Sequence, residues 1–82
     1  MNEMQKKIRE MTLVLLYLTS WEEKEFDMKF RRSWKGYDFD ILNELSDEGL
    51  ISDSRRSKSI ILRESGVEQA EALLVKYGIT TE

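Results

Sequence analysis

The hydrophobic residues at the start of the chain repeat with the period of an amphipathic helix. The residues that carry the repeat are Met4, Ile8, Met11, Leu15 and Leu18, with Val14 beside them. Asn2 stands where a helix N-cap is expected, and Gln5, three residues on, completes a capping box. We therefore expect a helix over residues 2–19. Its second half, MTLVLLYLTSW, is apolar nearly all round, which indicates either a central helix with neighbours on several sides or a helix that shares a dimer interface.

The next segment, SWEEKEFDMKFRRS, fits two different elements. Ser20 and Glu23 have the spacing of a capping box, and acidic residues open the segment while basic residues close it, as the helix dipole favours. Phe26 and Phe30 would then share one helical face. Phe26, Met28 and Phe30 also alternate with charged residues, as in a half-buried strand. We favour a helix, and residues 24–31 remain open to the strand interpretation.

A third helix is predicted from about Trp34 to Glu48, with Ser33 as its cap and Gly49 as its left-handed end. Its expected buried residues are Ile41, Leu42 and Leu45. Two short strands follow, LIS and KSIILR, joined by the turn DSRRS. A last helix begins at the capping box of Ser65 and Glu68 and ends at Gly78. Its expected buried residues are Val67, Ala70, Leu73, Leu74 and Tyr77.

These elements predict a single domain over residues 1–82, mostly α with a small β-hairpin (α+β), in the order helix, helix, helix, strand, strand, helix. The stretch LNELSDEGLISDSRRSKSIILRESGVEQAEALL resembles the second half of a winged-helix domain of the MarR or PadR type, through its Gly-Leu-Ile junction and the spacing from Leu62 to Gly66. SWKGYDFD is similar to a small family of uncharacterised bacterial winged-helix-like domains. The resemblance implies a winged helix-turn-helix fold and DNA binding. Arg63 departs from the usual threonine or serine after the wing, a role that Ser65 could take over.

Composition restricts the chemistry. The 82 residues include no histidine and no cysteine, so the commonest general base and metal ligand and all thiolates are absent. We therefore expect no enzyme, no metal site and no cofactor. No stretch approaches the roughly 18 to 20 apolar residues of a membrane span, and the N-terminus lacks the pattern of a signal peptide. The expected location is the cytoplasm.

Basic residues that could contact nucleic acid form two clusters. They are Lys29, Arg31, Arg32 and Lys35 before the third helix, and Arg55, Arg56 and Lys58 at the wing tip. Wing arginines can reach the minor groove or phosphates. A solvated turn whose charges discourage pairing of strand edges explains the wing charges slightly better. A formal net charge of −3, from 13 basic and 16 acidic residues, opposes nucleic-acid binding overall.

The third helix carries the opposite charge. Its acidic residues are Asp38, Asp40, Glu44, Asp47 and Glu48. They would repel the phosphate backbone if this helix entered the major groove. They are either solvated surface charges or an acidic face for a basic partner protein. Six of the eight aromatic residues fall within residues 21–39, where they fill the core or anchor a partner.

Two functional hypotheses follow. The first is a regulatory domain that contacts DNA through its wing. The second is a protein-interaction module that uses the third helix, and its candidate partner surface consists of Trp34, Phe39, Asp40, Glu44 and Asp47. Because a helix buries only one face, we expect Phe39 or Trp34 to be partly exposed. In either case we expect a homodimer through the first or last helix.

Overall fold

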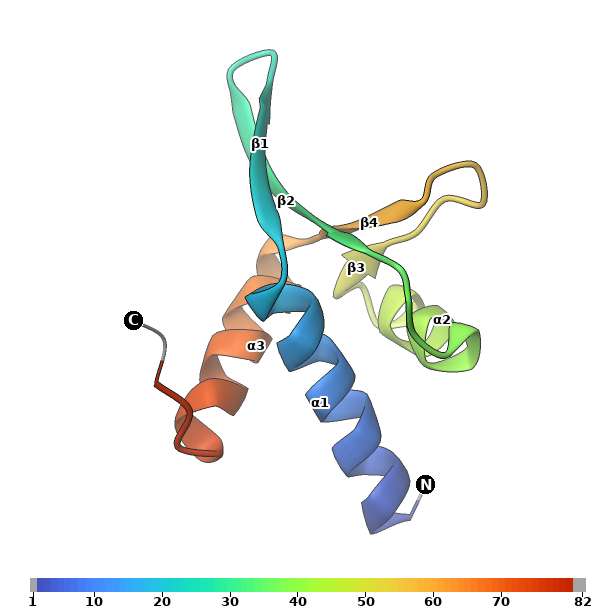
Figure 1. Ribbon diagram of the computed structural model, residues 1–82, viewed down its shortest axis with the longest axis vertical. Helices are drawn as coiled ribbons and strands as arrows, with labels where there is room; N and C mark the ends of the chain where they lie inside the picture. Colours follow the sequence, from blue (N-terminus) through green and yellow to red (C-terminus); the bar gives the residue numbers. More distant parts are fainter. Residues whose placement is uncertain (1, 81–82) are drawn as a thin grey trace.

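The computed structural model describes residues 2–80 and contains three helices and four strands (Figure 1). In chain order they are α1 (Glu3–Leu18), β1 (Trp21–Glu25), β2 (Met28–Trp34), α2 (Phe39–Asp47), β3 (Ile51–Ser52), β4 (Ser59–Leu62) and α3 (Glu64–Lys76). The predicted order of three helices, two strands and a helix is therefore wrong. None of the helices in the described part of the chain has the length and apolar character needed to cross a bilayer.

The four strands form one antiparallel sheet in the order β1-β2-β4-β3. Pairing of β2 with β4, in which Arg31 lies opposite Leu62 and Trp34 opposite Ser59, joins two hairpins that are separate in the sequence. The β1–β2 hairpin projects beyond the helices, and the β3–β4 loop projects in a different direction (Figure 1). Residues 19–38, all of them described, contain no helix before α2. The two consecutive helices that define a helix-turn-helix are therefore absent.

The second predicted helix is wrong because long-range strand pairing outweighs local helix signals. Capping and dipole effects contribute only about 1 kcal/mol each. The strand arrangement instead pairs every residue of β1 with β2 and buries Ser33 against the helices. Phe26 and Asp27 form the hairpin turn with φ values of 51° and 66°, the signs of a type I′ turn, whose twist suits paired strands. The alternation of Phe26, Met28 and Phe30 was the correct signal.

The core lies between the inner face of the sheet and the helices. Its buried residues are Leu13, Val14, Leu16, Leu42, Leu45, Leu50, Ile51, Ile60, Leu62, Ala70, Leu73 and Leu74. α1 lies between α2 and α3 (Figure 1). The buried residues predicted for the third and last helices are largely confirmed, since Ile41, Val67 and Tyr77 are partly buried against this core and the others are fully buried.

Most of the hydrophobic repeat of α1 faces away from this core, although Met11 packs against it and the adjacent Val14 is buried in it. Its four most exposed residues, Met4, Ile8, Leu15 and Leu18, are between 42% and 65% exposed. Leu13 and Leu16 on the opposite side make the core contacts. Both stripes have the helical period, so periodicity alone could not tell which one is buried. Asn2 caps α1 as predicted, by accepting a hydrogen bond from the Gln5 backbone N–H at 2.8 Å.

α2 begins at Phe39 rather than near Trp34, because Asp38 is its N-cap and accepts a hydrogen bond from the Asp40 backbone N–H at 2.8 Å. The predicted left-handed residue after this helix, Gly49, has φ of 76°. α3 begins one residue before Ser65. The Ser65 hydroxyl does not cap the helix and instead donates to the Gly49 carbonyl at 2.7 Å.

Candidate binding surface

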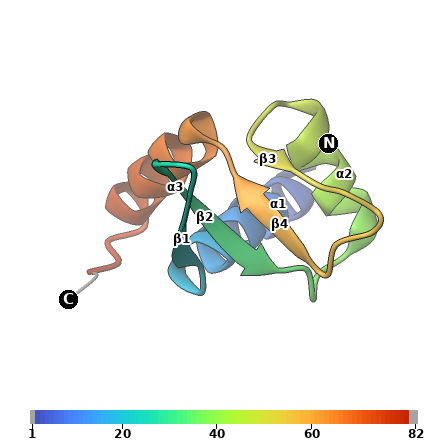
Figure 2. The same ribbon diagram turned by 90° about the horizontal axis from the view of Figure 1, so that it is seen from above.

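One face of the sheet has no helix over it in the described part of the chain. Seen from above, β2 and β4 lie over α1, which covers only their inner face (Figure 2). Residues alternate between the two faces of a strand. Since Ser33, Ile60 and Leu62 point inward and are buried, their neighbours point outward. The outer face therefore carries Trp21, Phe30, Arg32, Trp34 and Ile61.

Two tryptophans form the aromatic centre of this outer face. The ring centroids of Trp21 and Trp34 are 4.9 Å apart with an interplanar angle of 45°. Trp21 lies opposite Arg32 in β2, which brings its ring next to that of Trp34, two residues further along the strand. Trp34 is 62% exposed even with this partner. The pair thus presents an apolar surface to solvent.

Arg32 is held between these aromatic residues and the edge of the hairpin. Its Nε lies 2.7 Å from Glu23 Oε2, and its Nη1 donates to the Ser59 hydroxyl at 3.1 Å. Its Cζ is 5.3 Å from the centre of the Phe30 ring, within cation–π range. Arg32 is therefore preorganised, and its charge is already balanced by a carboxylate.

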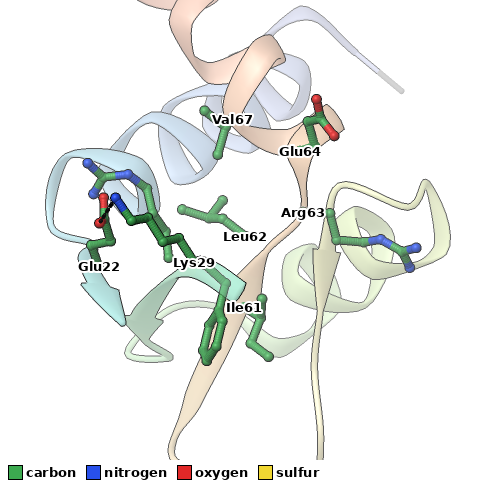
Figure 3. Close-up of a pocket in the computed structure, with 9 residues that line it drawn as sticks. Glu22, Lys29, Ile61, Leu62, Arg63, Glu64 and Val67 are labelled. Atoms are coloured by element: carbon green, nitrogen blue, oxygen red, sulfur yellow. Dashed lines mark ion pairs between the residues drawn. The ribbon is translucent and has the colours of Figure 1, made fainter. Parts of the chain in front are cut away.

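A groove of about 500 Å³ opens between the β1–β2 hairpin and the start of α3, mainly on the inner side of the sheet (Figure 3). It exists because β4 ends at Leu62, opposite Arg31, so the preceding residues of β2 have only β1 as a neighbour. Leu62 and Val67 point toward the space between the hairpin and α3, whereas Arg63 turns away from it (Figure 3). The apolar residues of the groove are Phe30, Ile61, Leu62 and Val67, and its charged residues are Glu22, Lys29, Arg31, Arg63 and Glu64.

The predicted basic residues before the third helix are mostly occupied within the protein. Lys29 lies 4.0 Å from Glu22, and Arg32 pairs with Glu23 as described above. Arg31 Nη1 donates to the Ser20 hydroxyl at 2.9 Å, and its Cζ lies 5.5 Å from the centre of the Tyr17 ring. These three residues would have to give up internal partners to contact phosphates.

The predicted basic residues around the wing have a different environment. Lys35 Nζ lies 2.8 Å from Asp53 Oδ1, and its backbone N–H donates to the Lys58 carbonyl, so Lys35 belongs with the wing. Arg55, Arg56 and Lys58 form no ion pair with any residue from 2 to 80. The seven candidates are thus divided between two hairpins that project in different directions.

The predicted partner surface is also divided. Trp34 lies on the sheet, whereas Phe39, 69% exposed, lies at the start of α2, so both residues expected to compete for burial are exposed. Asp40 and Glu44 line a second hollow, of about 350 Å³, between α2 and α1, and Asp47 does not line it. Arg9 of α1 lies 4.0 Å from Glu44 and pairs with Glu48. The acidic face of α2 is therefore partly neutralised.

Sequence reasoning missed Trp21, Phe30 and Ile61 as surface residues. A strand reading of the segment after α1 would have placed Phe30 and Trp34 on one face, since they differ by an even number of positions. The partnership of Trp21 with Trp34 depends on the hairpin register, and that register follows from the position of the two-residue turn.

A second polar cluster ties α1 to α3, away from this surface. The Tyr77 hydroxyl donates to Glu10 Oε1 at 2.6 Å, and Lys76 Nζ lies 3.3 Å from Glu10 Oε2. The hydrogen bond from Tyr77, followed by the contact with Lys76, lowers the pKa of Glu10. The same hydrogen bond raises the pKa of Tyr77. Burial is the main reason that the pKa of Tyr17 is raised.

Comparison with known proteins places the chain in one family. Residues 4–80 match the model of the family described as domain of unknown function (DUF6429), and the chain belongs to that family. It is also 37% identical over 68 residues to the uncharacterized protein y4hR of Sinorhizobium fredii (strain NBRC 101917 / NGR234), a match that covers 82% of each chain. No solved structure matches the chain.

Proposed function

We propose that this domain is a protein-binding module whose partner docks on the outer face of the sheet, with its contact centred on Trp21 and Trp34. The observation that carries the proposal is the exposure of Trp34, a large apolar side chain that packs against Trp21 on a face without a helix. Tryptophan is among the residues that contribute most to protein interfaces, and a single one can account for 2 kcal/mol or more, roughly, of binding free energy. Preorganisation lowers the entropy cost of binding.

The groove past the end of β4 adjoins the outer face only through Phe30 and Ile61, and a partner that reaches around this end of the sheet would enter it. The apolar residues of the groove can receive a hydrophobic side chain. Its charges are balanced, because Lys29 and Arg31 lie with Glu22 and Glu64 while Arg63 turns away (Figure 3). The partner that fits is an extended protein segment that presents a large apolar residue.

Charge argues for protein rather than nucleic acid as the ligand. The net charge of the chain is −3, and Glu23 and Glu25 share the face that carries the tryptophans. Arg32, the cation closest to the aromatic centre, is paired with Glu23. Bases could stack on the tryptophans, but the phosphates beside them would meet carboxylates rather than free cations.

Site-specific photocrosslinking tests this proposal. A benzophenone amino acid is placed at position 34, and at position 43 on the exposed side of α2 as a control, in cells of the source organism. We expect position 34 to crosslink one discrete protein and position 43 to leave it uncaptured. Crosslinking of nucleic acid from position 34, or equal capture from both positions, would overturn the proposal.

The crosslinked protein is then purified and its affinity measured. Trp21 and Trp34 are the only tryptophans of the chain, so their fluorescence reports directly on this face. Trp34→Ser should weaken binding by about 30-fold or more, as expected of an interface anchor. Asp47→Ser on α2 should leave it unchanged. A partner that binds Trp34→Ser as tightly as the wild type refutes the proposed surface.

A further inference from the structure

The outward stripe of α1 has the spacing of a helix–helix seam. Its exposed members are Met4, Ile8, Leu15 and Leu18, and Met11 between them is partly buried against the core. The intervals alternate between four and three residues, which is the pattern that places knobs into the holes of a facing helix. At about 100° per residue, this stripe is centred opposite Leu13, the middle of the buried side. α1 therefore has a second apolar side, of which Met4, Ile8, Leu15 and Leu18 stay between 42% and 65% exposed among the described residues.

The two flanks of the stripe differ in charge, because the α2 flank is acidic whereas the other flank carries both Lys7 and, one turn earlier, Glu3. On one flank, Gln5 and Ile8 line the 350 Å³ hollow together with Asp38, Asp40 and Glu44 of α2. Lys7 lies on the other flank, because residues two apart in a helix differ by about 200° around its axis and Gln5 is on the α2 side. Lys7 is exposed and forms no ion pair with residues 2–80.

We propose that the stripe is covered by the same stripe of a second copy of the chain, with the two α1 helices parallel. A twofold axis along the helices brings unlike flanks together, so Lys7 of each copy faces Asp40 and Glu44 of the other. A twofold axis across the helices, which makes them antiparallel, brings like flanks together and sets acidic α2 against acidic α2. Charge complementarity selects the parallel arrangement.

A second copy of the chain is the partner that this surface fits. A single surface supplies both the matched seam and both complementary flanks, which is what an isologous interface requires. The seam is only about two heptads long. Association is therefore weak and depends on protein concentration. The stripe faces away from the sheet, so the dimer leaves the tryptophan face of both copies free. The dimer and the proposed binding surface can therefore be tested independently.

Disulfide trapping in the purified protein tests the arrangement, because the chain has no cysteine of its own. In a parallel pair, Met4→Cys, Met11→Cys and Leu18→Cys each form a disulfide-linked dimer under mild oxidation. In an antiparallel pair, only Met11→Cys does so. Val75→Cys on α3, at a residue that is 82% exposed, is the control and should stay monomeric. Trapping at position 11 alone, or at none of the three, overturns the proposal.

Light scattering over a range of concentrations provides the second measurement. The mass should rise from 9.7 kDa toward twice that value, and Leu15→Glu should remain at 9.7 kDa while its circular dichroism stays that of the wild type. Lys7→Glu should weaken association about fivefold, the effect of losing two exposed ion pairs, and adding Asp40→Lys should restore it. A monomer mass at every concentration overturns the proposal.

Discussion

Replacing Gly66 with alanine should strongly destabilise the domain. A Cβ at this position would lie 2.0 Å from the Leu50 carbonyl oxygen and 3.0 Å from its carbon. Ordinary carbon–oxygen contacts begin at about 3.3 Å, so α3 and the start of β3 would have to separate by more than 1 Å, roughly. Both neighbours are backbone, and no rotamer change can relieve the overlap.

The cost has two parts. Overpacking of this kind costs about 1–3 kcal/mol. The same Leu50 carbonyl accepts a hydrogen bond from the Arg63 N–H at 3.0 Å, and stretching that bond adds about 1 kcal/mol or more. We expect a total of about 3–4 kcal/mol, a large share of the roughly 4–12 kcal/mol that stabilises a domain of this size.

Urea denaturation followed by circular dichroism measures this difference. Gly36→Ala is the matched control, because a Cβ there has no atom within 4 Å. It should leave stability unchanged or raise it by up to about 1 kcal/mol, because alanine lowers the conformational entropy of the unfolded chain. If the Gly66→Ala protein unfolds within about 1 kcal/mol of the control, α3 does not press on Leu50 and the described junction between β3 and α3 is incorrect.

Three further predictions concern the stability of other variants. Phe26→Asn should raise stability by about 1 kcal/mol, because asparagine tolerates the positive φ of this turn better than phenylalanine; an unchanged or lower melting temperature would contradict the turn. The lowered pKa of Glu10 means that its contribution to stability is present above the ordinary value of 4.5 and is lost as pH falls through the folded value. Urea titrations should therefore find Glu10→Gln and Tyr77→Phe less stable than the wild type at pH 7, with the gap closing in acid; a gap that is constant with pH would disprove the coupling. Trp34→Ser should cost under about 1 kcal/mol in stability while Leu42→Ala costs about 2–5 kcal/mol, and similar losses in thermal melts would contradict the exposure of Trp34.

The elements after residue 38 were predictable because local and tertiary signals agree there. The apolar face of α2, the left-handed Gly49 and the β-branched residues of β4 all favour the structure that forms. The segment from Trp21 to Trp34 was not predictable in the same way. Its capping and charge signals favour a helix, whereas its actual structure depends on β4, which lies 25 or more residues further along the chain. A single sequence does not reveal that pairing.

The candidate surface was predictable only in part. Phe39 or Trp34 was expected to be partly exposed, and both are exposed, but Trp34 lies on a strand of the sheet instead of the third helix. The acidic residues of α2 were assigned correctly to a helix, yet the partial neutralisation by Arg9 depends on how α1 packs, which no local pattern encodes. The outward stripe of α1 was visible as a pattern, but its direction was not.

β1 is an edge strand that pairs with β2 alone among the described strands. Strands held on one side and largely exposed tend to open locally, at a lower free energy than the whole domain unfolds. Amide hydrogens of β1 should accordingly exchange with solvent much faster than those of β4, which is paired on both sides. Because Trp21 belongs to β1, each opening separates it from Trp34. A molecule seated on both rings would hold β1 closed, so its affinity would include the free energy of that closure.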